Sequence, residues 1–294
     1  MNIITANGAM AQPVAEPISS SLQTRILSAL VLLPAVLALF YIGGLGFALL
    51  LALAAVLMAG EWDLLTEGAI RGPKFFGSFG TLGLATALIL LADLALAHFG
   101  QAGWALLLLA PGALLLTLLS RLTKRAALWP VLGLFWLGLP CLALLRLRMG
   151  DDGMLAVSWL FLVVWSCDTG AYFAGRRIGG PKLAPRVSPN KTWSGLLGGM
   201  ALAALASALL AVAMGLAGVA MLALLGAFLA LISQSGDLAE SAVKRHFKVK
   251  DSGALIPGHG GMLDRVDGVL FAAPALVLMT LASTLAPTLD VLPW

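Results

Sequence analysis

Residues 194–214 read SGLLGGMALAALASALLAVAM, 21 consecutive residues without one charged side chain. A helix of about 20 apolar residues is long enough to cross the ~30 Å hydrocarbon core of a bilayer. No soluble core could bury a chain of 294 residues that is 60% hydrophobic with a mean hydropathy of +0.99. We therefore predict an all-α, polytopic transmembrane helix bundle of about nine spans. Outward from 194–214, the other apolar stretches are 26–42, 45–60, 79–97, 102–119, 127–147, 154–174, 217–236 and 268–289.

The basic residues indicate how the bundle is oriented. With nine spans in alternating directions, 16 of the 18 Lys and Arg residues fall on one side, and only Arg146 and Arg148 on the other. Cytoplasmic loops of membrane proteins carry such an excess. We expect a multi-pass protein of the cell (inner) membrane, with its amino terminus in the cytoplasm and its carboxyl terminus outside.

The chain divides into three regions on this basis. Residues 1–24 are expected to form a disordered polar tail, residues 25–150 the amino-terminal transmembrane helices, and residues 151–294 a carboxyl-terminal transmembrane catalytic region. Cys141 and Cys167 fall in or beside predicted spans and are interpreted as small buried apolar residues without a disulfide. The net charge of +4 reflects the cytoplasmic loops, and we expect no nucleic acid as a partner.

Charge is concentrated in two polar stretches, predicted as loops 166–195 and 233–268. Together they hold 16 of the 32 charged side chains in 66 of the 294 residues. Placing a charged side chain in contact with lipid costs free energy, so a dense cluster of charged side chains must lie in water or bind a ligand. Both stretches fall on the cytoplasmic side, where they are expected to build one site in which a water-soluble substrate meets a lipid. The acids elsewhere are interpreted mostly as ordinary loop residues.

The first stretch offers an acid and a candidate phosphate-binding turn. Asp168 lies at an apolar helix end and is either functional or a partner of a nearby arginine. Gly170, Ala171, Ala174 and Gly175 form a small-residue face suited to close helix packing.

Ser188-Pro189-Asn190-Lys191-Thr192-Trp193 then precedes residues 194–214. It is not a Walker A motif, because Pro185 and Asn190 stand where glycines are needed. It fits either phosphate binding or a helix N-cap beside an interfacial tryptophan.

The second stretch combines acids, cations and glycines. If the preceding helix continues, Asp237, Glu240 and Lys244 share one face, as a metal and phosphate site or as a salt-bridged helix end. Asp264 and Asp267 are three residues apart, and oxygen ligands of this kind suit Mg²⁺. They follow Pro257-Gly258-His259-Gly260-Gly261, where His259 is either part of a ligand pocket or an ordinary turn residue.

Taken together, residues 241–267 resemble the signature of the phosphatidate cytidylyltransferases, or CDP-diacylglycerol synthases. The pattern is Ser-x-apolar-Lys-Arg, four residues, Lys-Asp, a spacer, then Pro-x-His-Gly-Gly-apolar-x-Asp-Arg-apolar-Asp, and this chain matches it throughout. The resemblance extends to 168–172, 188–193 and 236–237. It implies the reaction CTP + phosphatidic acid → CDP-diacylglycerol + pyrophosphate, with Mg²⁺ as cofactor and membrane lipid as surroundings.

Roles for individual residues follow as hypotheses. We assign metal ligation to Asp237 and Asp264, with Asp267 and Asp168 as further ligands or orienting groups. Phosphate contacts are assigned to Lys191, Lys244 and Arg265, with help from Ser188 and Thr192. The substrate pocket is completed by Asn190, Arg245, Lys250, Asp251, His259, Gly260 and Gly261.

Four other classes of protein are alternatives to this function. A transporter would scatter charge near the midplane, whereas here it gathers at one face. A CTP-dependent lipid kinase would transfer the γ-phosphate and leave CDP. A CDP-alcohol phosphotransferase is disfavoured, since the chain lacks an Asp-Gly-x₂-Ala-Arg run. A membrane scaffold would not explain the charged stretches. A homodimer is one assembly that the sequence allows.

Overall fold

The computed structural model describes residue 30 and residues 33–67, 80–253 and 260–285. In this part of the chain, eight helices are long and apolar enough to span a membrane. They correspond to the predicted stretches from 45–60 onward and confirm the all-α membrane bundle. They are α2 (Gly44–Glu67), α3 (Thr81–His98), α4 (Ala102–Leu122), α5 (Leu128–Arg148), α6 (Gly153–Arg177), α7 (Trp193–Ala213), α8 (Val219–His246) and α9 (Leu263–Leu285).

Two predictions fall wholly or partly outside the described residues. The tail 1–24 lies outside them, and the stretch 26–42 is described mainly as the short helix Leu33–Ile42. Which end of the bundle faces the cytoplasm stays a prediction.

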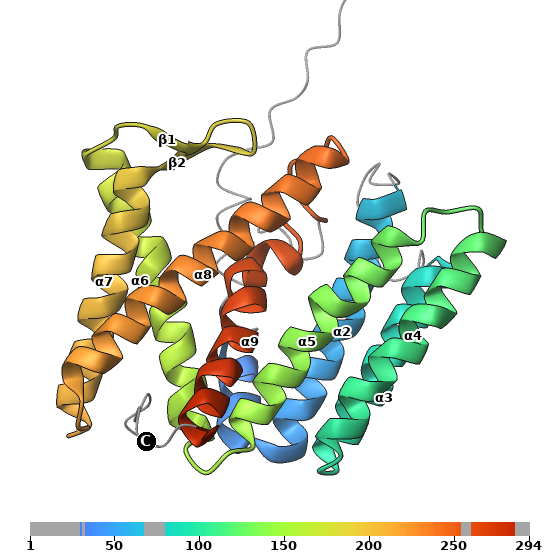
Figure 1. The fold of residues 1–294 in the computed structure, drawn as a ribbon, viewed down its shortest axis with the longest axis horizontal. Helices are drawn as coiled ribbons and strands as arrows, with labels where there is room; N and C mark the ends of the chain where they lie inside the picture. The colour runs from blue at the N-terminus through green and yellow to red at the C-terminus, as the bar shows by residue number, and fades with distance from the viewer. Residues whose placement is uncertain (1–29, 31–32, 68–79, 254–259, 286–294) are drawn as a thin grey trace, which may run out of the picture.

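The helices form two groups that meet along α9. Helices α2 to α5 pack on one another, and α6 to α9 form the second group, in which α8 runs obliquely across the others (Figure 1). Contacts of α5 and α2 with α9 join the groups. The carboxyl-terminal ends of α6 and α8 and the amino-terminal end of α9 all lie at the same end of the bundle (Figure 1).

The polar stretches predicted as loops are partly helical. Helix α6 continues to Arg177 and α8 to His246, so residues 166–177 and 233–246 belong to helices. The prediction placed helix ends where charge begins, but charged side chains stay in a helix when they pair with one another at the end of the bundle. Asp237, Glu240 and Lys244 consequently do lie at helical spacing.

Close packing of α6 on α7 confirms the predicted small-residue face. A Cβ atom at Gly170 would lie 2.6 Å from the carbonyl oxygen of Gly198, and one at Gly175 would lie 3.0 Å from Thr192 Oγ1. A Cβ atom at Gly198 would collide with Ala174. Small residues let the two backbones approach, which sets α6 and the start of α7 side by side at the polar end.

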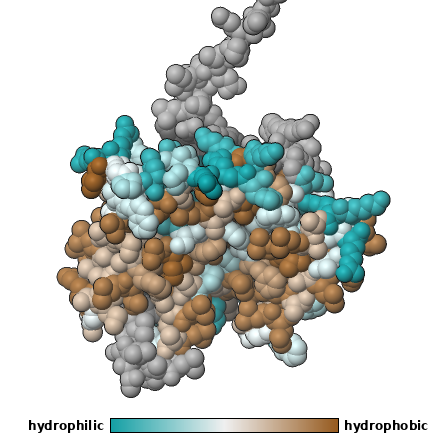
Figure 2. Space-filling view, turned by 45° about the horizontal axis from the view of Figure 1, so that its top comes forward, coloured by the Kyte–Doolittle hydropathy of each residue, from teal (hydrophilic) through white to brown (hydrophobic). Residues whose placement is uncertain are grey.

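A two-stranded hairpin, which the sequence analysis did not anticipate, covers this end of the bundle. Strands β1 (Lys182–Ala184) and β2 (Ser188–Thr192) are antiparallel, with Lys182 opposite Thr192 and Ala184 opposite Ser188. Figure 1 shows the hairpin above α6 and α7. Figure 2 shows hydrophilic side chains gathered at the same end, with apolar side chains around the flanks.

Buried residues correct or confirm two further interpretations. Cys141 and Cys167 are both free and buried, as predicted. Glu61, Asp63 and Asp93 are not ordinary loop residues, because they lie in α2 and α3 and are 6%, 3% and 1% exposed. Asp63 is paired: its carboxylate accepts hydrogen bonds from Arg125 (2.6 Å) and from the Gly80 backbone N–H (3.0 Å).

Candidate functional site

The first group of site residues, which we call the Lys191 cluster, consists of Asp168, Lys191, Gln234, Asp237 and Ser241. Strand β2 brings Lys191 over the ends of α6 and α8. Its ammonium group lies 2.5 Å from Asp237 Oδ2 and donates to Gln234 Oε1 at 2.9 Å. Gln234 in turn donates to Asp168 Oδ1 at 3.1 Å, and the Ser241 hydroxyl donates to Asp237 Oδ1 at 3.3 Å. One lysine thus connects two acids on two helices.

The Lys191 cluster borders a cavity of about 450 Å³. This volume is in the range of small-ligand sites, about 300–1,000 Å³. Both signs of charge and an apolar wall are present, so the cavity can hold a ligand with anionic and apolar parts. It is lined by Asp168, Ala171, Tyr172, Gly175, Arg176, Leu183, Asn190, Lys191, Thr192, Gly195, Leu196, Gln234 and Asp237.

The second group, which we call the Lys244 cluster, consists of Glu61, Glu240, Lys244, Ser252 and Asp264. Lys244 donates to Glu240 Oε1 at 3.0 Å and to Asp264 Oδ1 at 2.6 Å. The other Asp264 oxygen accepts from the backbone N–H of Ser252 (2.9 Å) and from its hydroxyl (2.9 Å). Glu240 is fully buried and Lys244 is 8% exposed. The salt-bridged helix end and the grouping of acids with cations are therefore both present here.

Asp267 lies between the two clusters. It follows Asp264 within one turn of α9, its backbone packs against α8 beside Asp237, and its Oδ1 accepts from the Gly268 backbone N–H at 2.7 Å. The close approach of α8 to α9 places it there, since a Cβ atom at Gly236 would lie 2.6 Å from the Asp267 carbonyl oxygen. The clusters are thus parts of one polar site.

The site offers oxygen atoms that could bind a divalent cation. Among the described residues, no group of three or more His, Cys, Asp or Glu side chains is close enough to hold a metal ion as arranged here. Yet Glu240 Oε2 is buried without a hydrogen-bond partner in this part of the chain, and Asp168, Asp237 and Asp267 are carboxylates within electrostatic range of one another. Oxygen donors of this kind suit Mg²⁺, which usually takes one or two carboxylates together with phosphates and waters.

The two predicted metal ligands differ in their surroundings. Asp237 borders the cavity, and its side chain is 29% exposed. Both oxygens of Asp264 are already engaged, by Lys244 on one side and by Ser252 and the Gly261 backbone N–H (3.1 Å) on the other. Asp237 is therefore the more accessible carboxylate, and Asp264 is held as a fixed part of the site.

Residues of the hairpin divide between the cavity and structural roles. Asn190 lines the cavity, whereas Ser188 lies farther along β2. Thr192 is buried and caps α7, because its hydroxyl accepts from the Gly195 backbone N–H at 3.1 Å. Trp193 beside it is half-exposed. The N-cap and the exposed tryptophan are thus observed, and Thr192 also borders the cavity.

The predicted residues in the last turn of α8 and just after it are not among those that line the cavity. Arg245 is exposed and donates to the carbonyl oxygens of Val187 (3.3 Å) and Val249 (3.0 Å), so it ties the hairpin to the end of α8. Lys250 and Asp251 are exposed in the following turn.

The predicted residues around the start of α9 lie beside Asp264. Gly260 has a positive φ of +87°, and Gly261 contributes its N–H to Asp264. Arg265 is exposed in the first turn of α9. His259 lies outside the described residues.

Three polar residues of the site received no role from the sequence. Gln234 and Ser252 link the acids described above, and Glu61 reaches the site from α2, far away in the chain. Gln234 could have been found, because it is a polar residue one turn before Asp237 in an otherwise apolar helix. Nothing in the sequence connects Glu61 with residues near 260.

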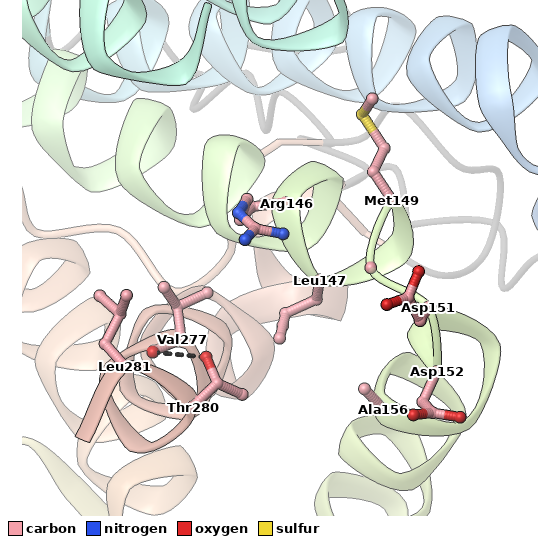
Figure 3. Close-up of a pocket in the computed structure, with 11 residues that line it drawn as sticks. Arg146, Leu147, Met149, Asp151, Asp152, Ala156, Val277, Thr280 and Leu281 are labelled. Atoms are coloured by element: carbon pink, nitrogen blue, oxygen red, sulfur yellow. Dashed lines mark hydrogen bonds between the residues drawn. The ribbon is translucent and has the colours of Figure 1, made fainter. Parts of the chain in front are cut away.

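A second polar cavity, of about 490 Å³, lies at the opposite end of the bundle. It is formed by the turn between α5 and α6 and by the last part of α9, with Arg146, Asp151 and Asp152 among its lining (Figure 3). Its acids are exposed at the turn, and its walls include neither cluster of the polar site. The concentration of paired acids and lysines distinguishes the first cavity as the candidate active site.

Comparisons with known proteins point to the same chemistry. The sequence model described as "Cytidylyltransferase family" matches residues 23–283. A phosphatidate cytidylyltransferase of Brucella suis biovar 1 is 47% identical over 265 residues, which cover 88% of this chain and 93% of that protein. One from Haemophilus influenzae is 38% identical over 287 residues, covering 86% of this chain and 96% of the relative. One from Bacillus subtilis is 44% identical over 133 residues, 45% of this chain and 49% of the relative.

Proposed function

We propose that this chain transfers CMP from CTP to phosphatidic acid and forms CDP-diacylglycerol and pyrophosphate. The premise is that the chain belongs to the cytidylyltransferase family. The structural observation that carries the proposal is the position of the Lys191 cluster. A lysine and several acids border a cavity at the polar end of an apolar helix bundle. That is where a charged nucleotide from water and the headgroup of a bilayer lipid can meet.

The reaction places specific demands on the site. A phosphate oxygen of phosphatidic acid attacks the α-phosphorus of CTP, a P–O bond forms, and the bond to the β-phosphate oxygen breaks as pyrophosphate leaves. The attacking oxygen is already ionised near neutral pH, so no strong general base is needed. Because both reactants are anionic, the barrier is lowered mainly by positioning and by cations that stabilise charge on the leaving oxygens.

The residues along the cavity can meet these demands. Lys191 and Arg176 both line it, and we assign to them contacts with phosphate groups. The Lys191 ammonium group is bonded to Asp237 and Gln234. A bound phosphate group would therefore replace the Asp237 carboxylate as the partner of Lys191. Lys244 and Arg265 remain further candidates for phosphate contacts.

We further propose that the enzyme uses Mg²⁺. Asp237, the carboxylate that borders the cavity, would hold the ion together with substrate phosphates and waters, while Asp168 and Asp267 would orient the site and Asp264 is fixed by Lys244 and Ser252. When bound, the ion would supply positive charge to screen the phosphates and to stabilise the leaving pyrophosphate.

Location in the inner membrane, a cytoplasmic active site and a homodimer also remain proposals for this chain.

The reaction is tested with purified protein in detergent, phosphatidic acid, Mg²⁺ and CTP labelled separately at the α- and γ-phosphates. The proposal expects the α label in the lipid and the γ label in released pyrophosphate. Transfer of the γ label to the lipid, with CDP as the other product, would make the protein a kinase and refute the proposal.

A further inference from the structure

Helix α2, in the half of the chain that the family signature does not reach, contributes a carboxylate to the start of α9. Glu61 Oε1 accepts a hydrogen bond from the Met262 backbone N–H at 2.7 Å, and Oε2 accepts one from the Leu263 N–H at 2.9 Å. Oε2 also lies 3.4 Å from the Ser252 hydroxyl. Glu61 is 6% exposed, so these bonds form away from water.

These hydrogen bonds lie next to Asp264 in the chain, so they can affect the position of its carboxylate. Leu263 is the first residue of α9, and the first N–H groups of a helix have no partner within it. Glu61 satisfies the N–H of Leu263 and that of Met262, the residue before the helix, across 202 and 201 residues of sequence. Asp264 is the next residue, and its own Oδ2 accepts from Ser252 and Gly261 in the same segment. The Ser252 hydroxyl therefore lies within hydrogen-bonding distance of both carboxylates. Together, Glu61 and Asp264 accept hydrogen bonds from the backbone of residues 261–263.

The backbone around Glu61 has little room to adjust. A Cβ atom at Gly253 would lie 3.1 Å from Glu61 Oε1, and one at Gly261 would lie 2.8 Å from Oε2. Glycine at both positions leaves the space that the Glu61 carboxylate occupies. The carboxylate can therefore reach the backbone N–H groups of Met262 and Leu263 at the start of α9.

We propose that Glu61 is a positioning residue for CMP transfer: it holds the start of α9, and through it the Asp264 carboxylate, in the arrangement that the reaction needs. The inference rests on the proposed function, because it takes Asp264 and its neighbours as the reaction site. Substitution of Glu61 by Gln is the sharpest test. Gln is nearly isosteric, but its NH₂ group is a donor and would face a backbone N–H in either orientation.

Two variants of the same helix serve as controls. Asp63 is two residues away and also buried, but among the described residues its carboxylate bonds to Arg125 and the Gly80 N–H and not to α9. Asp63→Asn therefore reports what loss of a buried structural carboxylate in α2 does. Glu67 is exposed at the end of α2, so Glu67→Gln reports the same chemical change without burial.

The experiment measures transfer of the α label from CTP to phosphatidic acid, together with amide hydrogen exchange of residues 260–266. Glu61→Gln is expected to lower kcat about 100-fold, because a small misplacement of reacting groups costs about that much. Exchange at the Met262 and Leu263 amides should rise about tenfold or more, while exchange elsewhere in the bundle stays unchanged. Asp63→Asn should lower thermal stability but keep kcat per folded molecule within about threefold, and Glu67→Gln should resemble the wild type.

Each outcome decides the matter. Glu61→Gln with a kcat within twofold of wild type overturns the inference, and so does equal loss of kcat per folded molecule in Asp63→Asn. If the wild type itself transfers no label, the proposed function fails instead, and the exchange measurement still shows whether Glu61 holds the start of α9.

Discussion

Replacing Lys244 by Met should destabilise the protein much more than the same replacement of Lys191. The Lys244 side chain is 10% exposed and bridges two carboxylates whose side chains are 0% (Glu240) and 12% (Asp264) exposed. The Lys191 side chain is 19% exposed, and that of its partner Asp237 is 29% exposed. Both substitutions remove one positive charge and keep a long apolar stem, so the comparison isolates the burial of the partners.

The expected magnitudes follow from what each substitution leaves behind. Without Lys244, the carboxyl groups of Glu240 and Asp264 lose the cation that they share, and removing one partner of a buried ion pair in this way costs about 3–5 kcal/mol. Without Lys191, Asp237 can be hydrated from the cavity, and a partly exposed pair contributes about 1 kcal/mol or less. The free energy of unfolding should therefore fall several times more in Lys244→Met.

The assay is thermal unfolding of the detergent-purified variants. The readout at each temperature is the fraction that still elutes as folded protein in size-exclusion chromatography. Lys244→Met should show the larger drop in Tm, and adding Glu240→Gln should recover part of it by removing the buried carboxyl group that has lost its partner. Equal drops in Tm for the two lysine variants would refute the reasoning, as would a further drop on adding Glu240→Gln.

Three other perturbations have defined outcomes. Asp264→Asn should lower kcat about 100-fold or more while the protein still inserts and purifies as folded protein, because the bond to Lys244 loses its charge; near-normal turnover would remove Asp264 from the site. Asp93→Leu should raise the free energy of unfolding by about 1–3 kcal/mol, since both Asp93 oxygens are buried without hydrogen-bond partners among the described residues; a lower Tm would show that the carboxylate is needed. Removal of divalent cations with EDTA should stop label transfer until Mg²⁺ is restored, and full activity in EDTA would exclude the proposed Mg²⁺ requirement.

The sequence was sufficient for the helices and for much of the site, because both depend on local patterns. Apolar runs of about 20 residues define spans wherever they occur. The spacing of Asp237, Glu240 and Lys244 was enough to predict that they share a helix face, and the structure confirms it. Likewise, the small residues of α6 could be interpreted as a packing face before the partner helix was known.

What could not be predicted depends on contacts between distant parts of the chain. The hairpin has strands of three and five residues, too short for a periodic pattern, and Pro189 lies within the second strand. The predicted stretch 45–60 stops before Glu61, yet α2 continues to Glu67, because Glu61 and Asp63 are buried in the helix and hydrogen-bonded to other parts of the chain. Glu61 acquires its role only when α9 begins beside it, and no feature near residue 61 indicates a partner 201 residues away.

If CMP transfer takes place beside Lys191 at the polar end of the bundle, the reaction should depend on this side chain. The experiment measures the rate of α-label transfer from CTP to phosphatidic acid in Lys191→Met, with Lys182→Met as the matched control. Lys182 is an exposed lysine of β1 in the same hairpin, and it is not among the residues that line the cavity. We predict that Lys191→Met lowers kcat about 100-fold, whereas Lys182→Met stays within twofold of the wild type. Near-normal transfer by Lys191→Met, or an equal loss in both variants, would contradict the account.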